Sequence, residues 1–485
     1  ASRGLGDVYK RQERMWVVLY TDVVMWLLEA LLLGTAWYVS RVPDLRAKWK
    51  AVFLRPAAQA SAAVLLLFFL TAFADSVHWR PALSAADSGA AVVYDVKTVS
   101  LLDAVLKNRT AAQERSYSAP FALRDFDKTT AVQEDGTAVR DYQRLKGVSA
   151  DVPEEHASVM LGKRFFASLL SGVMLLTVLW FVLAGLHKAM FKTPFTVSLT
   201  RVTARTNPAR PAIQVLQLAL LAAVVLSFIW PVRHVLGTDA VGNDVLVSAF
   251  KSVRTAVVIG TLATLSSLPF AVVLGLAAGY FRGWVDEAVQ YVYTVISSIP
   301  SVLLIAASVL LIQVFIDQNP QLYETGLERA DLRLFLLAVI IGVTSWAGLA
   351  RLLRAETMKT AATDFVTAAK AFGVPSWKIL ARHVLPNVIH IVLIVAVLDF
   401  SGIVLYEAVL SYVGVGVDPV IHSFGTMINA AAGEMSRSPV IWWNLAAALL
   451  FMGTLVLAAN LFAAAVREVF DPTSPRLFGR PARRK

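Results

Sequence analysis

Long apolar segments alternate with short polar segments along most of the chain. The first three apolar segments cover residues 15–39, 56–74 and 165–190. As a helix, each is long enough to cross a hydrocarbon core of ~30 Å, which needs about 20 residues. Membrane barrels have strands of about ten residues with alternating polarity, and no such alternation occurs in these segments. The pattern therefore predicts membrane-spanning helices.

Six more apolar segments predict a second group of spans. They cover residues 213–231, 252–279, 288–314, 334–352, 388–410 and 440–463. Of the 485 residues, 16% are charged and 57% are hydrophobic, whereas about a quarter of a soluble chain is charged. The sequence thus predicts an all-α polytopic membrane protein. In it, an N-terminal region of about three spans precedes a six-span core.

Residues 75–162 form a long polar insert between the second and third apolar segments. Residues 95–109 are predicted to form one amphipathic helix, and the sequence from Asn108 to Thr110 matches a glycosylation sequon that is frequent by chance. The insert shows no pairing of a nucleophile with a base and no metal-ligand spacing, and the chain has no cysteine. We therefore expect no catalytic residue and no metal site.

Basic residues indicate which polar segments face the cytoplasm. Residues 41–55 hold five basic residues and one acidic residue, and residues 191–211 and the tail after 463 are also basic. Cytoplasmic loops carry such an excess of Lys and Arg, so the net charge of +11 requires no nucleic-acid partner. Counting spans from these segments places residues 364–386 on the cytoplasmic side. This segment is here called the elbow. The same count puts the insert and the N-terminus outside.

The elbow is predicted to form two short helices. Thr363 or Asp364 can cap the first helix, and Gly373 can end it in a left-handed conformation. Pro375 suits the first turn of the second helix, and Pro386 is expected to stop it. Each helix has an apolar face at helical spacing. These faces comprise Phe365, Ala368, Ala369 and Phe372 in the first helix, and Trp377, Leu380, Ala381, Val384 and Leu385 in the second.

Basic amphipathic helices between spans often lie in the membrane interface without a partner. The order of residue types in the elbow favours a more specific function. Thr367-Ala368-Ala369, three residues, Gly373, nine residues and then His383-Val384-Leu385-Pro386 closely resembles the EAA loop of ABC-importer permeases. The resemblance implies a coupling helix that enters a groove of a cytoplasmic ATPase subunit. Thr367 replaces the Glu of the family pattern, and His383 replaces its Ile. The coupling residues so implied are Asp364, Thr367, Ala368, Ala369, Gly373, Trp377, Arg382, Leu385 and Pro386.

Further segments resemble, in the same order, permeases of the dipeptide, oligopeptide and nickel class. They are residues 234–257, 278–290, 295–304, 346–358, 406–431 and 466–476. Residues 278–290, for example, read AGYFRGWVDEAVQ where the family has AGYxGGWVDxxxM. Residues 1–212 carry no part of the resemblance. The predicted divisions are residues 1–74 with the first membrane segments, the external insert 75–162, the third span and cytoplasmic linker 163–212, and the permease domain 213–485.

The resemblance implies the permease subunit of an ATP-driven importer, with peptides as the expected substrate. The implied partners are a second permease subunit in a heterodimer, two ATPase subunits, an external substrate-binding protein and membrane lipid. The implied location is the bacterial cytoplasmic (inner) membrane. The chain has no GxxxxGK[ST] phosphate-binding loop. We therefore expect a transport subunit and not an enzyme, with no cofactor bound by this chain and with ATP and Mg²⁺ on the partner ATPase.

Other functions stay open at this point. The same architecture could import nickel chelates or peptide antibiotics. An ion-coupled secondary transporter would show related halves and buried charges in broken spans, but the halves share no evident repeat. A membrane enzyme would need a catalytic constellation in the insert. Copurification of a nucleotide-binding subunit would separate the importer from both of these classes.

Five residues are candidates for the substrate pathway or an external gate: Asp239, Asp244, Asp399, Glu407 and Tyr412. Asp239 and Asp244 could bind a cation or a peptide amine, although turn and capping roles are commoner. Asp399 and Glu407 lie in or near a span, where an ionisable group is costly and by default faces a cavity or a partner. Glu407 is expected to hold an outside loop, which leaves Asp399 as the better pathway candidate.

We predict that a reporter fused after Asp125 is external, whereas reporters fused after Thr203 or at the C-terminus are cytoplasmic. The reason is the excess of basic residues in the linker 191–211 and in the tail. Paired fusions to a phosphatase that is active only outside and to a fluorescent protein that is active only inside measure this. A cytoplasmic signal after Asp125 would contradict the count of spans.

Overall fold

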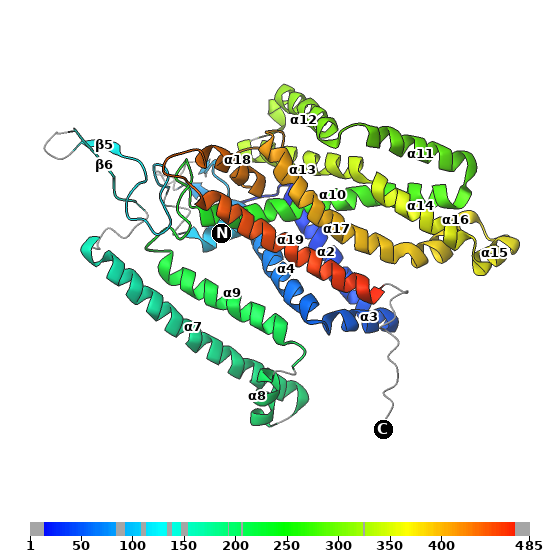
Figure 1. Cartoon of the computed structure of the whole chain (residues 1–485), viewed down its shortest axis with the longest axis horizontal. Helices are drawn as coiled ribbons and strands as arrows, with labels where there is room; N and C mark the ends of the chain where they lie inside the picture. Colours follow the sequence, from blue (N-terminus) through cyan, green and yellow to red (C-terminus); the bar gives the residue numbers. More distant parts are fainter. Residues whose placement is uncertain are drawn as a thin grey trace, which may run out of the picture. The chain divides into compact units, whose positions relative to one another are not determined.

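The structure is a computed structural model (Figure 1), and it describes residues 14–83, 93–107, 113–132, 138–146, 154–192, 194–204, 207–323 and 325–470. The chain divides into two compact units. The first unit comprises Ala1–Val18, Gln59–Thr255 and His422–Leu455, and the second comprises Leu19–Ala58, Ala256–Ile421 and Val456–Lys485. Both units therefore cross the predicted division at residue 212, which stays a prediction. The sequon at Asn108 and the basic residues after 470 lie outside the described residues.

Within the described ranges, nine helical segments are long and apolar enough to cross a membrane. Each one matches an apolar segment of the sequence, so the prediction of a polytopic helical membrane protein is confirmed. The helices are α2 (Tyr20–Arg41), α4 (Pro56–Asp75), α7 (Glu154–Phe191), α9 (Arg210–Ile229), α10 (Val245–Phe281), α12 (Ser301–Gln318), α13 (Gly326–Ser345) with α14 (Ala347–Ala361), α17 (Leu385–Tyr412) and α19 (Trp443–Phe470).

Two predicted spans have different bounds in the structure. The apolar segment 288–314 is not one helix, because Ile299 and Pro300 separate α11 (Gly283–Ser298) from α12. Proline has no N–H to donate, and the residue before it avoids the helical region. Ile299 is accordingly extended, with φ −88° and ψ 130°. The predicted span 334–352 is instead made of α13 and α14, which together reach Ala361.

The described part of the insert contains a small antiparallel sheet. β1 (Arg14–Val17) pairs with β2 (His78–Leu83), and β2 also pairs with β3 (Val93–Tyr94) and β4 (Val99–Ser100). This pairing joins the segment before the first span to the segment after the second.

The predicted amphipathic helix over residues 95–109 is wrong for most of its length. Its described part contains β4 and then the single turn α5 (Leu101–Val105). The hydroxyl of Ser100 accepts a hydrogen bond from the Asp103 N–H at 3.0 Å and so caps α5. Further along the insert, β5 (Thr129–Val132) and β6 (Ala138–Asp141) form a separate antiparallel hairpin.

The first unit also contains a helical hairpin in which α7 and α9 lie side by side, with α8 (Phe195–Thr203) between them in sequence (Figure 1). Gly172 of α7 makes room for a leucine of α9, because a Cβ at Gly172 would lie 2.5 Å from the Leu221 Cδ1 atom. The Arg164 guanidinium of α7 donates to the Phe228 carbonyl of α9 at 3.4 Å.

In the second unit, α10 packs closely against α13 and α14. A Cβ on Gly275 or Gly279 of α10 would lie 2.8 or 2.6 Å from a backbone carbonyl oxygen of α14. Gly342 of α13 likewise lies against the Ala263 carbonyl of α10, with no space for a Cβ. Small residues permit such close approach of helix backbones in membranes. The backbone of α10 therefore determines how closely both neighbours can approach.

The N-terminal helix α2 is part of the second unit. Asp331 of α13 accepts hydrogen bonds from the Thr21 N–H at 3.1 Å and from the Thr21 hydroxyl. A buried carboxylate of α13 thus satisfies a free N–H at the positive end of α2. Next in sequence, α3 (Pro43–Phe53) packs on the last turns of α19, where Arg55 forms an ion pair with Glu468. These contacts tie the N-terminal segments to helices of the predicted permease domain.

We predict that Asp331→Ala lowers the thermal stability of the full chain in detergent. Removing the acceptor of two buried Thr21 donors costs about 1–3 kcal/mol, while each span still inserts because of its apolar residues. Unfolding followed by tryptophan fluorescence measures the change. The control is Asp317→Ala, which removes an exposed ion pair with Arg329 and should cost at most about 1 kcal/mol. Equal midpoints for Asp331→Ala and wild type would contradict the capping role.

Candidate functional site

The first half of the elbow is the short helix α15 (Asp364–Ala371), which follows α14 after a turn (Figure 1). Thr363 is its N-cap residue, but the side chain makes no capping hydrogen bond. Gly373 has φ +71°, which confirms the predicted left-handed residue. The N–H groups of Gly373 and Val374 donate to carbonyls of the last turn at 3.0 and 3.1 Å, as in a Schellman motif. A Cβ on Gly373 would meet nothing within 4 Å, so only its backbone conformation favours glycine.

The second half of the elbow does not stop at Pro386, so that prediction is wrong. α16 (Ser376–Ile379) continues through a π-helical turn (Leu380–Val384) directly into α17. In this wider turn the Leu385 N–H donates to the carbonyl five residues earlier. Pro386 then falls in the first turn of α17, where its missing N–H is tolerated. An uninterrupted helix therefore joins the elbow to a membrane span.

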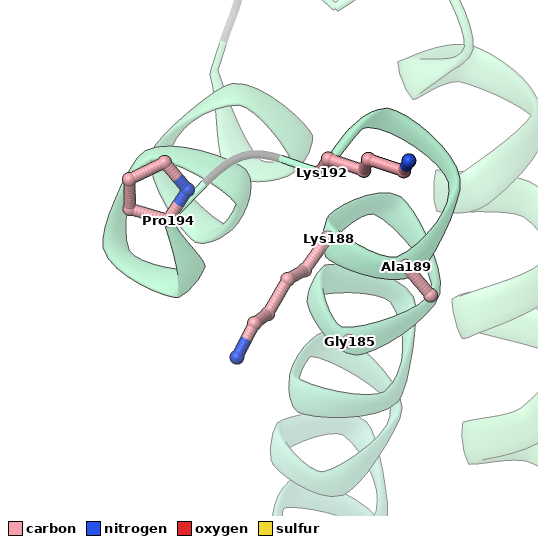
Figure 2. Close-up of a pocket in the computed structure, with 5 residues that line it drawn as sticks. All are labelled: Gly185, Lys188, Ala189, Lys192 and Pro194. Carbon is pink, nitrogen blue, oxygen red and sulfur yellow. The ribbon is translucent and has the colours of Figure 1, made fainter.

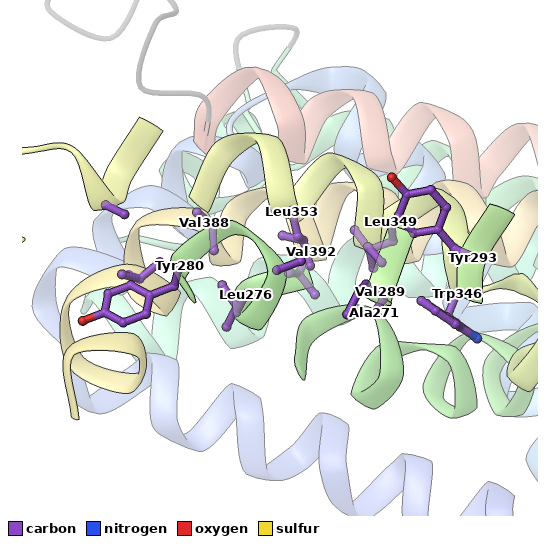
Figure 3. Close-up of a cluster of buried hydrophobic side chains, with 14 of the residues drawn as sticks. Ala271, Leu276, Tyr280, Val289, Tyr293, Trp346, Leu349, Leu353, Val388 and Val392 are labelled. Atoms are coloured by element: carbon purple, nitrogen blue, oxygen red, sulfur yellow. The ribbon is translucent and has the colours of Figure 1, made fainter. Parts of the chain in front are cut away.

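One side of the elbow is buried in the core of the second unit. Val366, Ala369, Ile379 and Val384 are 0%, 9%, 1% and 0% exposed. They belong to one hydrophobic cluster with residues of α10, α11, α14 and α17, and Figure 3 draws part of this cluster. Because a close-packed core resists local deformation, the elbow is mechanically joined to the ends of these four helices.

Three large aromatic side chains of the elbow are exposed. Phe365, Phe372 and Trp377 are 47%, 88% and 67% exposed. The sequence predicts one apolar face for each short helix, whereas the structure divides each face. Ala369 and Val384 enter the core, and the large aromatic residues stay uncovered. Of the other implied coupling residues, Leu385 is partly buried, and the exposed ones are Asp364, Thr367, Ala368, Gly373, Arg382 and Pro386.

The turn between α10 and α11 lies beside the elbow. The Lys370 Nζ atom of the elbow lies 4.4 Å from the ring centroid of Tyr280, at the end of α10. Arg354 of α14 donates two hydrogen bonds to Asp286 of α11, at 2.5 and 2.6 Å. These bonds hold the pKa of Asp286 below its usual range. Sequence reasoning missed this bidentate pair, although both residues lie in segments that resemble the family.

The same turn contains a non-glycine residue in a left-handed conformation. Arg282 has φ +55° and Gly283 has φ +54°. Arg282 stands where the family pattern has glycine, and a left-handed conformation costs a non-glycine residue roughly 1–2 kcal/mol. The tight turn next to the elbow is therefore retained in this chain despite backbone strain.

Two candidate pathway residues have structural roles in the first unit. Asp244 precedes α10, and its carboxylate accepts a hydrogen bond from the Leu246 N–H at 2.9 Å, as an N-cap does. Asp239 accepts hydrogen bonds from the N–H groups of Val241 and Asn243, both at 2.9 Å, as in an Asx turn. The sequence left open whether these aspartates bind a ligand or have structural roles. In the structure, Asp244 caps a helix and Asp239 forms a turn.

The insert covers the loop that contains these two aspartates. His234 contacts Asp244 through Nδ1 at 2.7 Å and Glu114 of the insert through Nε2 at 3.3 Å, and both contacts are buried. The Glu114 backbone also lies against Gly242, with no space for a Cβ. In addition, the Thr238 hydroxyl donates to a carbonyl of the insert at 2.8 Å. The insert therefore provides part of the polar partners of this loop, and the loop itself provides the others.

A second set of polar contacts joins the insert to the start of α10. Lys251 forms an ion pair with Asp103 at 2.7 Å, and the Arg254 Nε donates to the Ser76 hydroxyl at 3.2 Å. Burial by itself raises the pKa of Asp103, but Lys251 and a neighbouring serine outweigh it and hold the pKa below its usual value. Burial and the nearby Lys251 lower the pKa of His422 to about 4, so this imidazole is neutral at pH 7.

The remaining pathway candidates lie on α17. Glu407 is 1% exposed and accepts a hydrogen bond from Ser411 at 2.7 Å, and the Ser411 oxygen accepts one from the Val417 N–H at 3.2 Å. Glu407 thus orders the segment after α17. Tyr412 is 55% exposed at the helix end. Asp399 lies near the middle of α17 and is partly exposed. Among the residues described, none forms a hydrogen bond or ion pair with the Asp399 carboxyl.

An open cavity of about 490 Å³ lies between the end of α7 and the start of α8 (Figure 2). Its lining consists of Gly185, Lys188, Ala189, Lys192 and Pro194. Figure 2 shows the Lys188 and Lys192 amines pointing in different directions, so the two charges do not converge on one ligand. We assign this cavity no part in the candidate site.

Comparison with known proteins places these features in one family. Residues 271–474 match the family described as "Binding-protein-dependent transport system inner membrane component". The oligopeptide transport system permease protein OppC of Haemophilus influenzae is 30% identical over 239 residues, which are 49% of this chain and 70% of that protein. OppC of Mycobacterium tuberculosis (strain H37Rv) is 31% identical over 245 residues, 50% of this chain and 78% of that protein. The glutathione transport system permease protein GsiD of Pectobacterium atrosepticum is 27% identical over 241 residues, 49% of this chain and 72% of that protein.

Proposed function

The chain belongs to the family of binding-protein-dependent transport system inner membrane components, and from this premise we propose that it is the permease subunit of an ATP-driven peptide importer. Family membership and the spanning helices in the described residues make it a multi-pass protein of the bacterial inner membrane. Several relatives are named as oligopeptide or dipeptide permeases, which supports peptides as the substrate class. Glutathione, named for another relative, is itself a short peptide.

One observation carries the coupling role: the elbow is anchored on one side and uncovered on the other. Phe365, Phe372 and Trp377 present large apolar surfaces to the solvent, and an exposed apolar patch of this kind marks a protein interface. We propose that a groove of the ATPase subunit receives these side chains, in the helix-in-groove mode. Thr367 and Ala368 lie on the same uncovered part of α15.

The proposed mechanism is alternating access driven by the ATPase. ATP binding and hydrolysis change the conformation of the ATPase, and with it the position that the elbow prefers. Because the elbow shares a core with α10, α11, α14 and α17, its displacement changes the arrangement of those helices. The ATPase binds the two states of the permease with different free energies, and this difference drives the change.

The full importer that we propose contains a second permease subunit, two ATPase subunits and an external binding protein that delivers substrate. ATP and Mg²⁺ bind to the ATPase subunits, and this chain contributes no cofactor site. A nickel-chelate or peptide-antibiotic substrate would use the same machinery, so the identity of the copurifying binding protein distinguishes these cases.

We predict that Gly373→Leu reduces recovery of the ATPase subunit in a pull-down at matched permease levels. The left-handed conformation costs leucine roughly 1–2 kcal/mol, which misaligns α15 and α16 without preventing insertion of the spans. Gly373→Asn is the matched control, because asparagine tolerates this conformation. Thr367→Glu should be tolerated or should strengthen binding, since it restores the family residue. Equal recovery with wild type and Gly373→Leu would disprove the coupling role and favour an interfacial elbow.

We predict that Phe372→Ser weakens ATPase binding roughly tenfold or more, because burying a phenylalanine side chain contributes about 1.5–3 kcal/mol. Its side chain is 88% exposed, so the fold of the permease should be unaffected. Val241→Ser removes an apolar side chain that is 61% exposed on an outer loop and serves as the control. Unchanged ATPase affinity in Phe372→Ser would show that the aromatic side of the elbow is not the docking surface.

We further propose that Asp399 lines the pathway, because a carboxyl at this depth in lipid needs a cavity or a partner. We predict that Asp399→Asn raises the KM for peptides with a free amino terminus roughly tenfold, as expected for loss of a charged hydrogen bond. N-acetylated peptides and the Asp399→Glu variant are the controls. A parallel loss for free and acetylated peptides in Asp399→Asn would rule out contact with the peptide amine.

A further inference from the structure

The helix α3 presents a surface that the transport mechanism does not use. It joins α2 to α4 through Val42 on one side and through Leu54 and Arg55 on the other. Such short connections to two spans keep α3 at the membrane surface. The charge count of the sequence assigns this surface to the cytoplasmic side. The following inference needs only this location and does not depend on ATPase coupling.

One side of α3 is fixed to the end of α19. The Trp49 ring centroid lies 6.4 Å from that of Phe462 and 5.6 Å from that of Phe470. Val52 is 0% exposed and packs in a cluster with Ala465 and neighbouring residues of α19. The aromatic and aliphatic contacts therefore determine which side of α3 is left uncovered.

The uncovered side combines cationic and apolar side chains. Arg46 and Lys50 are exposed and, being four residues apart, lie on the same face of the helix. Leu54 follows on this side and is 56% exposed. The Phe53 ring is 44% exposed and borders this side, because it also packs 6.2 Å from the Trp49 ring and 6.3 Å from the Phe462 ring. Within the described part of the chain, neither Arg46 nor Lys50 has a carboxylate partner. By contrast, the nearby Arg55 is paired with Glu468.

From this arrangement we propose that α3 is a binding site for the phosphate headgroups of anionic phospholipids. Arg46 and Lys50 bind the headgroup, and Leu54 enters the boundary of the acyl chains. Basic side chains beside exposed apolar ones are typical of helices that lie in the membrane interface, and basic clusters next to a span attract anionic lipid. A bound lipid would hold α3 on α19 and so stabilise the end of the last span.

The test measures thermal unfolding of the detergent-purified full chain during titration with phosphatidylglycerol or phosphatidylcholine. We expect phosphatidylglycerol to raise the midpoint of wild type more than phosphatidylcholine does. In Arg46→Gln/Lys50→Gln, the phosphatidylglycerol concentration for half of the shift should rise roughly thirtyfold, because each basic residue near an anionic surface contributes about a factor of five. The response to phosphatidylcholine should not change. An additional titration with inorganic phosphate at constant ionic strength tests whether a free anion suffices.

Two control variants make the outcome decisive. Arg46→Lys/Lys50→Arg keeps both charges and should keep the phosphatidylglycerol response, which separates loss of charge from loss of fold. Lys188→Gln/Lys192→Gln removes two exposed charges at the end of α7, where the amines diverge (Figure 2), and should leave the response unchanged. An equal loss in this variant, or an unaltered response in Arg46→Gln/Lys50→Gln, would overturn the proposal. A shift by inorganic phosphate as large as that by phosphatidylglycerol would show that the site binds a free anion and not a lipid.

Discussion

The close approach of α14 to α10 is the contact on which the position of the elbow depends. Gly275 and Gly279 leave no space for a side chain between the two helices, so the backbone of α14 rests directly on that of α10. The Arg354–Asp286 pair adds α11 to this assembly. Helices in lipid gain little from the hydrophobic effect between them and associate through such close packing and polar contacts. The elbow follows α14 and is therefore held at the end of a closely packed set of helices.

The elbow combines two properties that transmission of movement requires. Val366, Ala369, Ile379 and Val384 bind it to the core of the second unit, while Phe365, Phe372 and Trp377 remain available to another molecule. The π-helical turn before α17 lets the chain continue into the membrane as one helix, so no flexible joint separates the elbow from the span. Force applied to the uncovered side would act on α17 directly and on α10 and α14 through the shared core.

In the first unit, satisfaction of buried polar groups is the main constraint. The loop from His234 to Asp244 contains backbone and side-chain groups that would be costly to bury unpaired. The insert provides partners for them, among them the Glu114 carboxylate and a carbonyl near Ser116. The insert is thus part of the structure around this loop.

The sequence by itself determined the class of the protein, where most of the spans lie and the left-handed Gly373, and it predicts a cytoplasmic elbow. These features depend on local properties, namely the length of apolar segments, the charge of the loops and the backbone freedom of glycine. Only the tertiary structure decided which elbow residues are buried, because Ala369 and Phe372 belong to the same apolar face in the sequence, and only Ala369 packs in the core. It also decided that the helix continues through Pro386. In the π-helical turn before it, the Leu385 N–H donates to the carbonyl five residues earlier. The covering of the loop from His234 to Asp244 by the insert likewise depends on partners more than a hundred residues apart in sequence, which no local pattern specifies.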